Sequence, residues 1–516
     1  MKMKSFGPLM LKLGLLWPGL LCAQLEVAGI FTDHMVLQRD QPIAIWGTAA
    51  PSSEVAVSLG EKKVTAKVDE AGHWKAVLEA RPASGPFELK VDSGSEHTAL
   101  KDVMIGDVWL ISGQSNMVLA LQSTTEWPEL KKAGDIPAIR ICKLPGDYAF
   151  DPADKYSRPL RWEVLNSAKA GYFSGVGYSF ARALQPAIGV TLGVIQGSAG
   201  GTQAEQWTPE AQLKAALPDN PLFAVRDKAR AKVEAAKAQA AAKPASEAKT
   251  PAEPALTGEA EPQAEATPTA KAPVAKVGVM ESGATSMYNG TIHPLRLLKL
   301  TGVLWYQGEA NSRSPRDYRP VLTTMIKAWR EVFAEPKLPF VIVQLPNFGL
   351  PKDDGWMRVQ EAQRLVAHDL GLGLVVTIDQ GSPTTIHPPN KVEVGRRAAI
   401  AALQNVYKKD VEGTAPRPKE VKFQGDTAVV EFDGFKGNLV LKGDAVKGFE
   451  LAGADQKFVP AVATIEGRSV KVKADGVPEP KAIRYLWANS PEAVTVFSDA
   501  GLPAVPFRTN KEGKVY

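Results

Sequence analysis

The stretch from residue 24 to 102 alternates apolar and polar side chains in short runs. Val55–Leu59, His73–Leu78 and Phe87–Val91 each alternate with a period of two, and turn residues separate them. A period of two places successive side chains on opposite faces of a strand. We therefore predict a small N-terminal β-sandwich-like module over residues 24–102.

From residue 103 to 408 the pattern changes to short apolar runs followed by helical periodicity. The runs predict strands at Val108–Ile111, Val190–Ile195, Gly302–Tyr306, Phe340–Gln344 and Leu374–Ile378. The periodic stretches predict helices at Gly177–Gln185, Tyr318–Phe333, Met357–His368 and Val394–Tyr407. Such alternation is typical of an α/β fold with a parallel sheet and helices on both faces. In such a sheet, chemistry gathers at the carboxyl ends of the strands.

Two further segments break or follow this domain. Residues 228–280 begin with an Ala/Lys/Glu-rich stretch that suits a short solvated helix and continue with Pro, Ala, Glu and Thr. So few large apolar side chains cannot offset the entropy of ordering, so we predict a disordered insertion within the domain. Residues 409–516 return to short β-like runs divided by Gly and Asp, which predicts a C-terminal β-rich module.

The N-terminal 23 residues have the layout of a secretory signal peptide. Lys2 and Lys4 precede an apolar stretch, and Ala23 suits the last residue before cleavage. We therefore predict a secreted or periplasmic protein whose mature chain has no membrane span. After cleavage only Cys142 remains, so no intrachain disulfide is expected.

Composition adds limits rather than a function. The chain is 44% hydrophobic and 23% charged, as in ordinary globular proteins. Its net charge of +5 is small for 516 residues, and we predict no nucleic-acid partner.

Ser115 stands at a predicted strand-to-helix turn. The buried strand Val108–Ile111 ends at Ser112 and Gly113, and an apolar stretch follows Ser115. A hydroxyl on such a turn projects beyond the sheet edge, where the serine's own N–H can help to bind an oxyanion. Taken alone, this residue is more typical of a helix N-cap than of a nucleophile.

Three other polar clusters follow predicted strands. One is Gln196–Thr202, with Glu205 and Trp207 behind it, and another is Trp305–Asn311. Paired glycines let backbone N–H groups approach a ligand, and amide side chains at a sheet edge can complete an oxyanion hole. Each cluster taken alone also fits an ordinary polar turn.

The last cluster, Asp379–Lys391, contains His387 in a loop between a strand and a helix. A histidine there suits a general base, since its unperturbed pKa lies near neutrality. His293 also precedes a proline, so the pattern by itself does not choose between the two histidines.

The motifs together resemble the sialate O-acetylesterase family of SGNH hydrolases, which have a flavodoxin-like α/β/α core. The order of the motifs carries the resemblance: Gly113–Met117, Gly200–Thr202, Trp305–Asn311 and Ile386–Lys391. Met35–Arg39, Ser286–Gly290 and Gly501–Thr509 match as well, so the resemblance covers nearly the whole mature chain outside the insertion.

The resemblance implies Ser115 as the nucleophile and His387 as the base. It implies oxyanion donors at the Ser115 N–H, Gly201, Gln307 and Asn311. The family's aspartate often stands two residues before the histidine, where this chain has Thr385. Either the enzyme uses a Ser-His dyad or another acid substitutes, with Asp379 as the first candidate and Glu309 as the second.

The resemblance also implies a substrate: an acetylated carbohydrate, with sialic acid the expected sugar and no metal or cofactor required. The expected substrate-binding residues are Gln114, Asn116, Glu205, Trp207, Glu309 and Arg313, the arginine for a sugar carboxylate. Acetylated xylan or another polysaccharide is the alternative substrate. A non-catalytic carbohydrate-binding protein on the same scaffold is the alternative class, and the sequence leaves the oligomeric state open.

Overall fold

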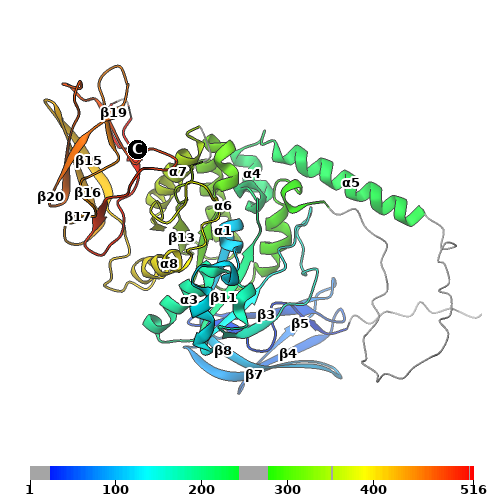
Figure 1. Cartoon of the computed structure of the whole chain (residues 1–516). Coiled ribbons are helices and arrows are strands. Elements are labelled where there is room, and N and C mark those ends of the chain that lie inside the picture. Colours follow the sequence, from blue (N-terminus) through cyan, green and yellow to red (C-terminus); the bar gives the residue numbers. More distant parts are fainter. Residues whose placement is uncertain (1–23, 243–276, 350–352, 511, 516) are drawn as a thin grey trace, which may run out of the picture.

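The computed structural model describes residues 24–242, 277–349, 353–510 and 512–515. Figure 1 shows three parts: an N-terminal β module in blue, a central α/β domain, and a C-terminal β module in orange and red. The predicted signal peptide, residues 1–23, lies outside the described residues. Over the described ranges, no helix is both long and apolar enough to cross a membrane.

The N-terminal module contains two sets of paired strands. One sheet joins β1 (Glu26–Val27), β3 (Ile43–Thr48) and β6 (His73–Leu78). The second set contains β2 (Val36–Gln38), β4 (Glu54–Leu59), β5 (Lys62–Lys67), β7 (Ser84–Ser93) and β8 (Glu96–Gly113). In β4 and β6 buried and exposed side chains alternate, which is the sequence pattern that predicted strands here.

Strand β8 is long and belongs to both the N-terminal module and the central domain. Its first half pairs with β7 and β2, and its second half pairs with β11 (Leu192–Ser198) and β12 (Gly302–Tyr306). The expected boundary at residues 102 and 103 therefore falls inside one continuous strand, and no linker separates the two parts.

The central sheet has the order β10-β9-β11-β8-β12-β13-β14. Its remaining strands are β9 (Asp135–Lys143), β10 (Trp162–Asn166), β13 (Phe340–Val343) and β14 (Gly373–Val375). Neighbours from β9 to β14 are parallel, and β10 is an antiparallel edge strand. The five strands β11-β8-β12-β13-β14 follow chain order 2-1-3-4-5, the flavodoxin-like doubly wound order, whose switch point lies at β8.

Helices cover both faces of this sheet, as predicted. Trp109 and Ile111 of β8 face α3 (Gly175–Ile188), which packs on α8 (Val392–Asn405). Trp305 of β12 faces the other way, onto Trp329 of α6 (Pro315–Val332), beside α7 (Gly355–Asp369). Because both faces are covered, the strands are apolar on both sides, which explains the unbroken apolar runs.

The structure corrects several element boundaries. The last core strand ends at Val375, not Ile378, because Val376 and Ile378 pack into the apolar core of the C-terminal module. Strands β9 and β10 were not predicted. The expected insertion starts inside helix α5 (Leu222–Ala242), which extends from the central domain in Figure 1, and residues 243–276 lie outside the described ranges.

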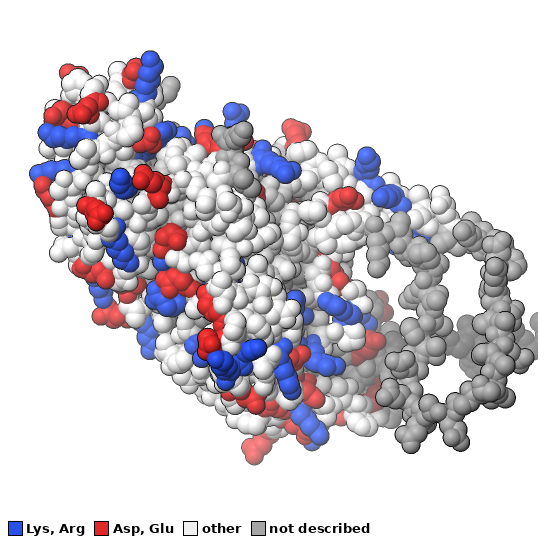
Figure 2. All heavy atoms as spheres, in the orientation of Figure 1, with Lys and Arg blue, Asp and Glu red and all other residues white. Residues whose placement is uncertain are grey.

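The C-terminal module is built from short antiparallel strands. One sheet joins β15 (Arg417–Gln424), β16 (Thr427–Asp433), β21 (Ser469–Lys473) and β20 (Val462–Glu466). A second joins β19 (Val459–Pro460), β18 (Phe449–Ala452), β22 (Ala482–Tyr485) and β24 (Phe507–Arg508), and β17 (Leu439–Leu441) pairs with β23 (Val496–Ser498). On the face drawn in Figure 2, acidic and basic side chains are intermixed rather than gathered by sign.

Candidate active site

Ser115 opens the short helix α1 (Ser115–Val118) at the carboxyl end of β8. Gly113 makes the turn with a φ of +134°, and a Cβ there would lie 2.0 Å from the Tyr306 carbonyl oxygen. The Gln114 N–H donates to that same oxygen at 3.0 Å. Only glycine fits this close approach, so the local sequence fixes where the partly exposed serine leaves the sheet.

Gln114 anchors the turn before Ser115 to the loop after β12. Its side chain is buried, and Oε1 accepts hydrogen bonds from the Gln307 Nε2, the Gly308 N–H and the Ala310 N–H. These contacts tie the loop after β12 to the turn before Ser115. The role of Gln114 in substrate binding stays a prediction.

Asn116 connects the Ser115 turn to the His387 loop. Its Nδ2 donates to the Ile386 carbonyl oxygen at 2.9 Å. Ser115 and His387 are the immediate chain neighbours of these two residues. The turn that carries Ser115 and the loop that carries His387 therefore lie side by side, although the two residues are 272 positions apart in the numbering.

Two buried charged side chains hold the same Asn116 carboxamide. Its Nδ2 also donates to Glu309 Oε1 at 2.6 Å, and its Oδ1 accepts from Lys391 Nζ at 2.7 Å. Burial raises the pKa of Glu309 to about 6, against the lowering effect of the Asn116 hydrogen bond. Burial lowers the pKa of Lys391 to about 8, against the raising effect of Glu309.

His387 lies in an exposed loop with its imidazole uncommitted. Its backbone N–H donates to Thr385 Oγ1, but the ring nitrogens have no hydrogen-bond partner within the described part of the chain. Partial burial, and then the nearby Lys391 charge, lower the pKa of His387 below its ordinary 6.5. A neutral imidazole is the form that accepts a proton, so this shift suits a general base at neutral pH.

Asp379 does not reach His387. Its two carboxylate oxygens accept from Arg397 Nη1 at 2.6 Å and Nη2 at 2.7 Å, and Gln380 Nε2 donates to it as well. A bidentate ion pair of this kind locks a carboxylate in place. In this structure Asp379 therefore ties the segment after β14 to α8, and its role as the acid that orients the imidazole stays a prediction.

Gly200, rather than Gly201, is the glycine beside Ser115. A Cβ on Gly200 would lie 3.7 Å from the Ser115 Cβ, whereas one on Gly201 would meet the Met280 side chain. Gly201 instead provides the turn, with a φ of +73°. Neither the Ser115 N–H nor the Gly200 N–H donates a hydrogen bond to any residue that the structure describes.

The amides of Gln307 and Asn311 are committed to the interior. Gln307 Nε2 lies within hydrogen-bond distance of Gln114 Oε1, the Thr202 carbonyl and Asn311 Oδ1. Asn311 Nδ2 donates to Glu205 Oε2 at 2.9 Å, and both amides are fully buried. In this structure these groups brace the loops around the site, and their role as oxyanion donors stays a prediction.

The remaining expected substrate residues divide into buried and exposed. Glu205 is buried and bonded to Asn311, and burial raises its pKa. Trp207 is fully buried in a T-shaped contact with Trp305, and its Nε1 donates to Thr202 Oγ1. Both side chains are packed in the interior in this structure, and their role in substrate binding stays a prediction. Arg313 alone is exposed, on the 3-10 turn η9 (Glu309–Arg313) beside the site.

His293, the other candidate base, is placed elsewhere. Its Nδ1 lies 3.0 Å from the Ala153 carbonyl oxygen, and its ring contacts that of Tyr288. The structure links the Ser115 turn to His387 through Asn116, and this choice between the two histidines was not available from the sequence pattern.

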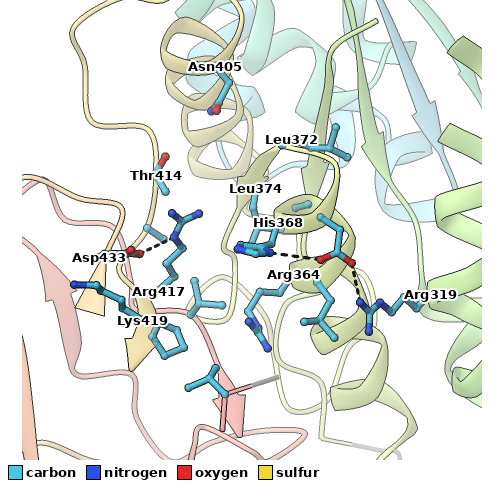
Figure 3. Close-up of a pocket in the computed structure, with 18 residues that line it drawn as sticks. Arg319, Arg364, His368, Leu372, Leu374, Asn405, Thr414, Arg417, Lys419 and Asp433 are labelled. Atoms are coloured by element: carbon cyan, nitrogen blue, oxygen red, sulfur yellow. Dashed lines mark hydrogen bonds and ion pairs between the residues drawn. The ribbon is translucent and has the colours of Figure 1, made fainter. Parts of the chain in front are cut away.

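One cavity lies away from these residues, beside the C-terminal module. It has a volume of about 610 Å³ and opens between α7 and strands β15 and β16 of the C-terminal module. In Figure 3, Arg417 and Lys419 lie on one side of it and His368 and Arg364 on the other. Neither Ser115 nor His387 lines it. Within the described ranges, no group of three or more His, Cys, Asp or Glu side chains is placed to hold a metal ion.

Sequence reasoning assigned no role to Lys391 or Gly200. Both stand inside motifs that the resemblance used, but a buried lysine cannot be told from a surface lysine without the fold. One local signal existed: Lys391 is the N-cap of α8, where a positive charge opposes the helix dipole.

Comparison with known proteins identifies the family. The family model described as carbohydrate esterase, sialic acid-specific acetylesterase, matches residues 105–236 and 275–404, just over half of the chain. The sialate O-acetylesterase of Mus musculus is 26% identical over 93% of both chains, and that of Homo sapiens is 27% identical over 96% of both. The crystal structure of a carbohydrate acetylesterase from Xanthomonas citri is 33% identical, with a TM-score of 0.79 over 94% of this chain and 99% of that one.

These matches confirm the resemblance that the motifs indicated. The chain belongs to the sialic acid-specific acetylesterase family of carbohydrate esterases, and it is a carboxylic ester hydrolase that deacetylates carbohydrate.

Proposed function

We propose that this protein is a serine esterase in which Ser115 attacks the acetyl carbonyl and His387 acts as general base. The observation that carries the proposal is the Asn116 side chain, which joins the residue after the serine to the residue before the histidine. The Ser115 hydroxyl and the imidazole form no hydrogen bond in this structure. Catalytic hydrogen bonds are often long without substrate and tighten in the complex.

The reaction runs in two halves. His387 takes the hydroxyl proton as Ser115 attacks, and the tetrahedral intermediate collapses as the sugar alcohol leaves with that proton. Water then attacks the acetyl-serine, again with His387 as base, and acetate is released. A covalent acetyl-enzyme is therefore the intermediate that this mechanism requires.

The oxyanion is bound by backbone donors. The Ser115 N–H and the Gly200 N–H come from neighbouring turns, after β8 and β11, and neither donates a hydrogen bond to a described residue. Each preorganised donor to a developing oxyanion contributes roughly 3–4 kcal/mol to transition-state stabilisation.

The imidazole works without a carboxylate on its second nitrogen. Asp379 is bound to Arg397, and Glu309 is bound to Asn116. The proposal is therefore a Ser-His dyad on a flavodoxin-like SGNH core, in a secreted or periplasmic protein. The acid's absence lowers the rate without changing the reaction class, since oxyanion binding and positioning remain.

Sialic acid is the proposed sugar, because the full-length relatives are sialate O-acetylesterases. Arg313, exposed beside the site, is the proposed cation for its carboxylate. A second candidate is another acetylated carbohydrate such as acetylated xylan, because the more similar Xanthomonas citri structure is described only as a carbohydrate acetylesterase.

The test measures acetate release from O-acetylated sialic acid, acetylated xylan and p-nitrophenyl acetate by wild type and Ser115→Ala. The proposal expects Ser115→Ala to lose all three activities. Equal rates for the two proteins on p-nitrophenyl acetate would remove Ser115 from the mechanism. Release from xylan alone would replace the proposed sugar, and no release from any glycan would favour a carbohydrate-binding protein.

A further inference from the structure

Lys391 occupies a position that general physical chemistry disfavours. Its side chain is 1% exposed, and it caps the N-terminus of α8, where the helix dipole repels a cation. Gly175 makes room for it, since a Cβ there would lie 3.3 Å from the Lys391 Cβ. A choice that breaks local rules in this way points to a functional constraint.

The hydrogen bonds of Lys391 and Glu309 leave Asn116 one orientation. An ammonium only donates, whereas an ionised carboxylate and a backbone carbonyl only accept. The Asn116 oxygen must therefore face Lys391, and its nitrogen must face both Glu309 and the Ile386 carbonyl. With the amide turned over, all three contacts would be repulsive.

We propose that Lys391 and Glu309 are a pair of positioning residues that lock the Asn116 carboxamide and so hold the His387 loop against the Ser115 turn. This inference rests on the proposed roles of Ser115 and His387. Lys391 and Glu309 act through Asn116 and touch neither the substrate nor the reacting atoms.

The pair weakens the fold that it organises. The pKa of Lys391 falls from 10.5 in the unfolded chain to about 8 in the folded one. The free energy of unfolding is therefore highest above pH 10.5, where the lysine is neutral in both states, and it decreases as pH falls through about 8. The pKa of Glu309 rises from 4.5 in the unfolded chain to about 6 in the folded one. For this group the free energy of unfolding is highest below pH 4.5 and decreases as pH rises through about 6. At pH 7 both charges are present, and both oppose folding.

Because both charges lower the free energy of unfolding at pH 7, the effect of removing them on stability distinguishes a positioning role from a merely structural one. Replacing a buried charge pair by neutral side chains of similar volume is often neutral or stabilising. In Lys391→Met/Glu309→Gln, methionine donates nothing, and a glutamine amide accepts Asn116 in either orientation. The protein should therefore remain folded while the lock is lost.

The main experiment measures kcat, KM and Tm of this double variant with p-nitrophenyl acetate at pH 7. We expect kcat to fall about 100-fold, the usual effect of misplacing catalytic groups by about 1 Å. We expect KM within about threefold of wild type and a Tm equal to or above that of wild type. A matched control is Lys419→Met/Glu431→Gln, which removes an exposed ion pair on the C-terminal module and should change neither kcat nor Tm.

A second measurement is the pH profile of kcat/KM for Lys391→Met alone. The Lys391 cation is one of the two causes that lower the pKa of His387. Removing it should move the acid limb of the profile to higher pH, whereas Lys419→Met should leave that limb in place.

The outcomes are distinct. A double variant with wild-type kcat overturns the proposal, and so does a kcat loss that disappears when both proteins are assayed far below their Tm. An unmoved acid limb in Lys391→Met overturns the electrostatic part. If Ser115→Ala keeps full activity, the proposed function itself fails, and this result is separate from all the others.

Discussion

The edge of the central sheet beside Ser115 and the core of the C-terminal module bury different kinds of side chain. In the C-terminal module, Val430, Leu451 and Val470 are fully buried, and ion pairs such as Lys419–Glu431 stay exposed. At the edge beside Ser115, the buried side chains include Asn116 and Lys391, joined by a hydrogen bond. Apolar packing would cost less free energy there, so the difference supports the proposal that this edge carries the active site.

The largest effect is expected when the proposed base, His387, is removed. His387→Ala should lower kcat for p-nitrophenyl acetate by about 10⁴- to 10⁶-fold, because the Ser115 hydroxyl then has no group to accept its proton. Tm should stay close to that of wild type, since the exposed imidazole has no hydrogen-bond partner among the described residues. A kcat close to that of wild type would mean that His387 is not the base.

A second test places a methyl group at the proposed oxyanion site. Gly200→Ala puts a Cβ 3.7 Å from the Ser115 Cβ without a steric clash with the fold. We expect kcat/KM to fall roughly 10–100-fold as the donor is shielded, with Tm unchanged. The matched control is Gly425→Ala on the C-terminal module, where φ is +59° and no atom lies near. It should cost about 1 kcal/mol of stability and leave kcat/KM as it was.

The wild-type pH profile is a third test. Since the pKa of His387 is lowered, activity should be lost only as pH falls below 6.5 and the imidazole becomes protonated. Measuring kcat/KM from acid to neutral pH locates this limb. A limb above 6.5 would show that His387 is stabilised as a cation, as a carboxylate partner would do, and would contradict the dyad.

A fourth test concerns the acid that the sequence suggested. Asp379→Asn breaks the ion pair with Arg397, so the free energy of unfolding should fall by about 3 kcal/mol. The kcat of the folded protein should stay within about threefold of wild type. Urea unfolding and kcat measured on the same preparation check both. A kcat loss near 10⁴-fold would restore Asp379 to the triad.

The smallest effect on catalysis is expected from the C-terminal core. Leu451→Ala should lower the free energy of unfolding by roughly 2–5 kcal/mol, the usual cost of such a cavity. The kcat per folded molecule should not change, because Leu451 contacts none of the site residues discussed above. A large kcat loss in folded protein would mean that the module contributes to the reaction.

The sequence predicted the strands that consist of a short apolar run and the helices whose apolar residues recur with the helical period. Gly302–Tyr306 matches β12 residue for residue, and Met357–His368 lies within α7. Strands β9 and β10 were missed because β9 contains Pro137 and mixed polar positions, and its pairing with β11 is set by tertiary contact.

The candidate site was predictable in its motifs but not in its contacts. Ser115 and His387 carry recognisable chemistry in turns at strand ends. The committed amides of Gln307 and Asn311 and the ion pair of Asp379 are interactions between distant segments, which no local pattern encodes. The sequence shows that residue 207 is a tryptophan but not that its ring packs on Trp305, so burial of this side chain could not be predicted.

The most direct test of the central claim is to trap the acetyl-enzyme. Wild-type protein is quenched in acid during turnover of p-nitrophenyl acetate, digested and analysed by mass spectrometry, with Ser115→Ala treated in parallel. We expect one acetyl group on the peptide that contains Ser115, located on that residue by fragmentation, and none in the variant. An acetyl group found instead on another side chain, and equally in both proteins, would contradict it.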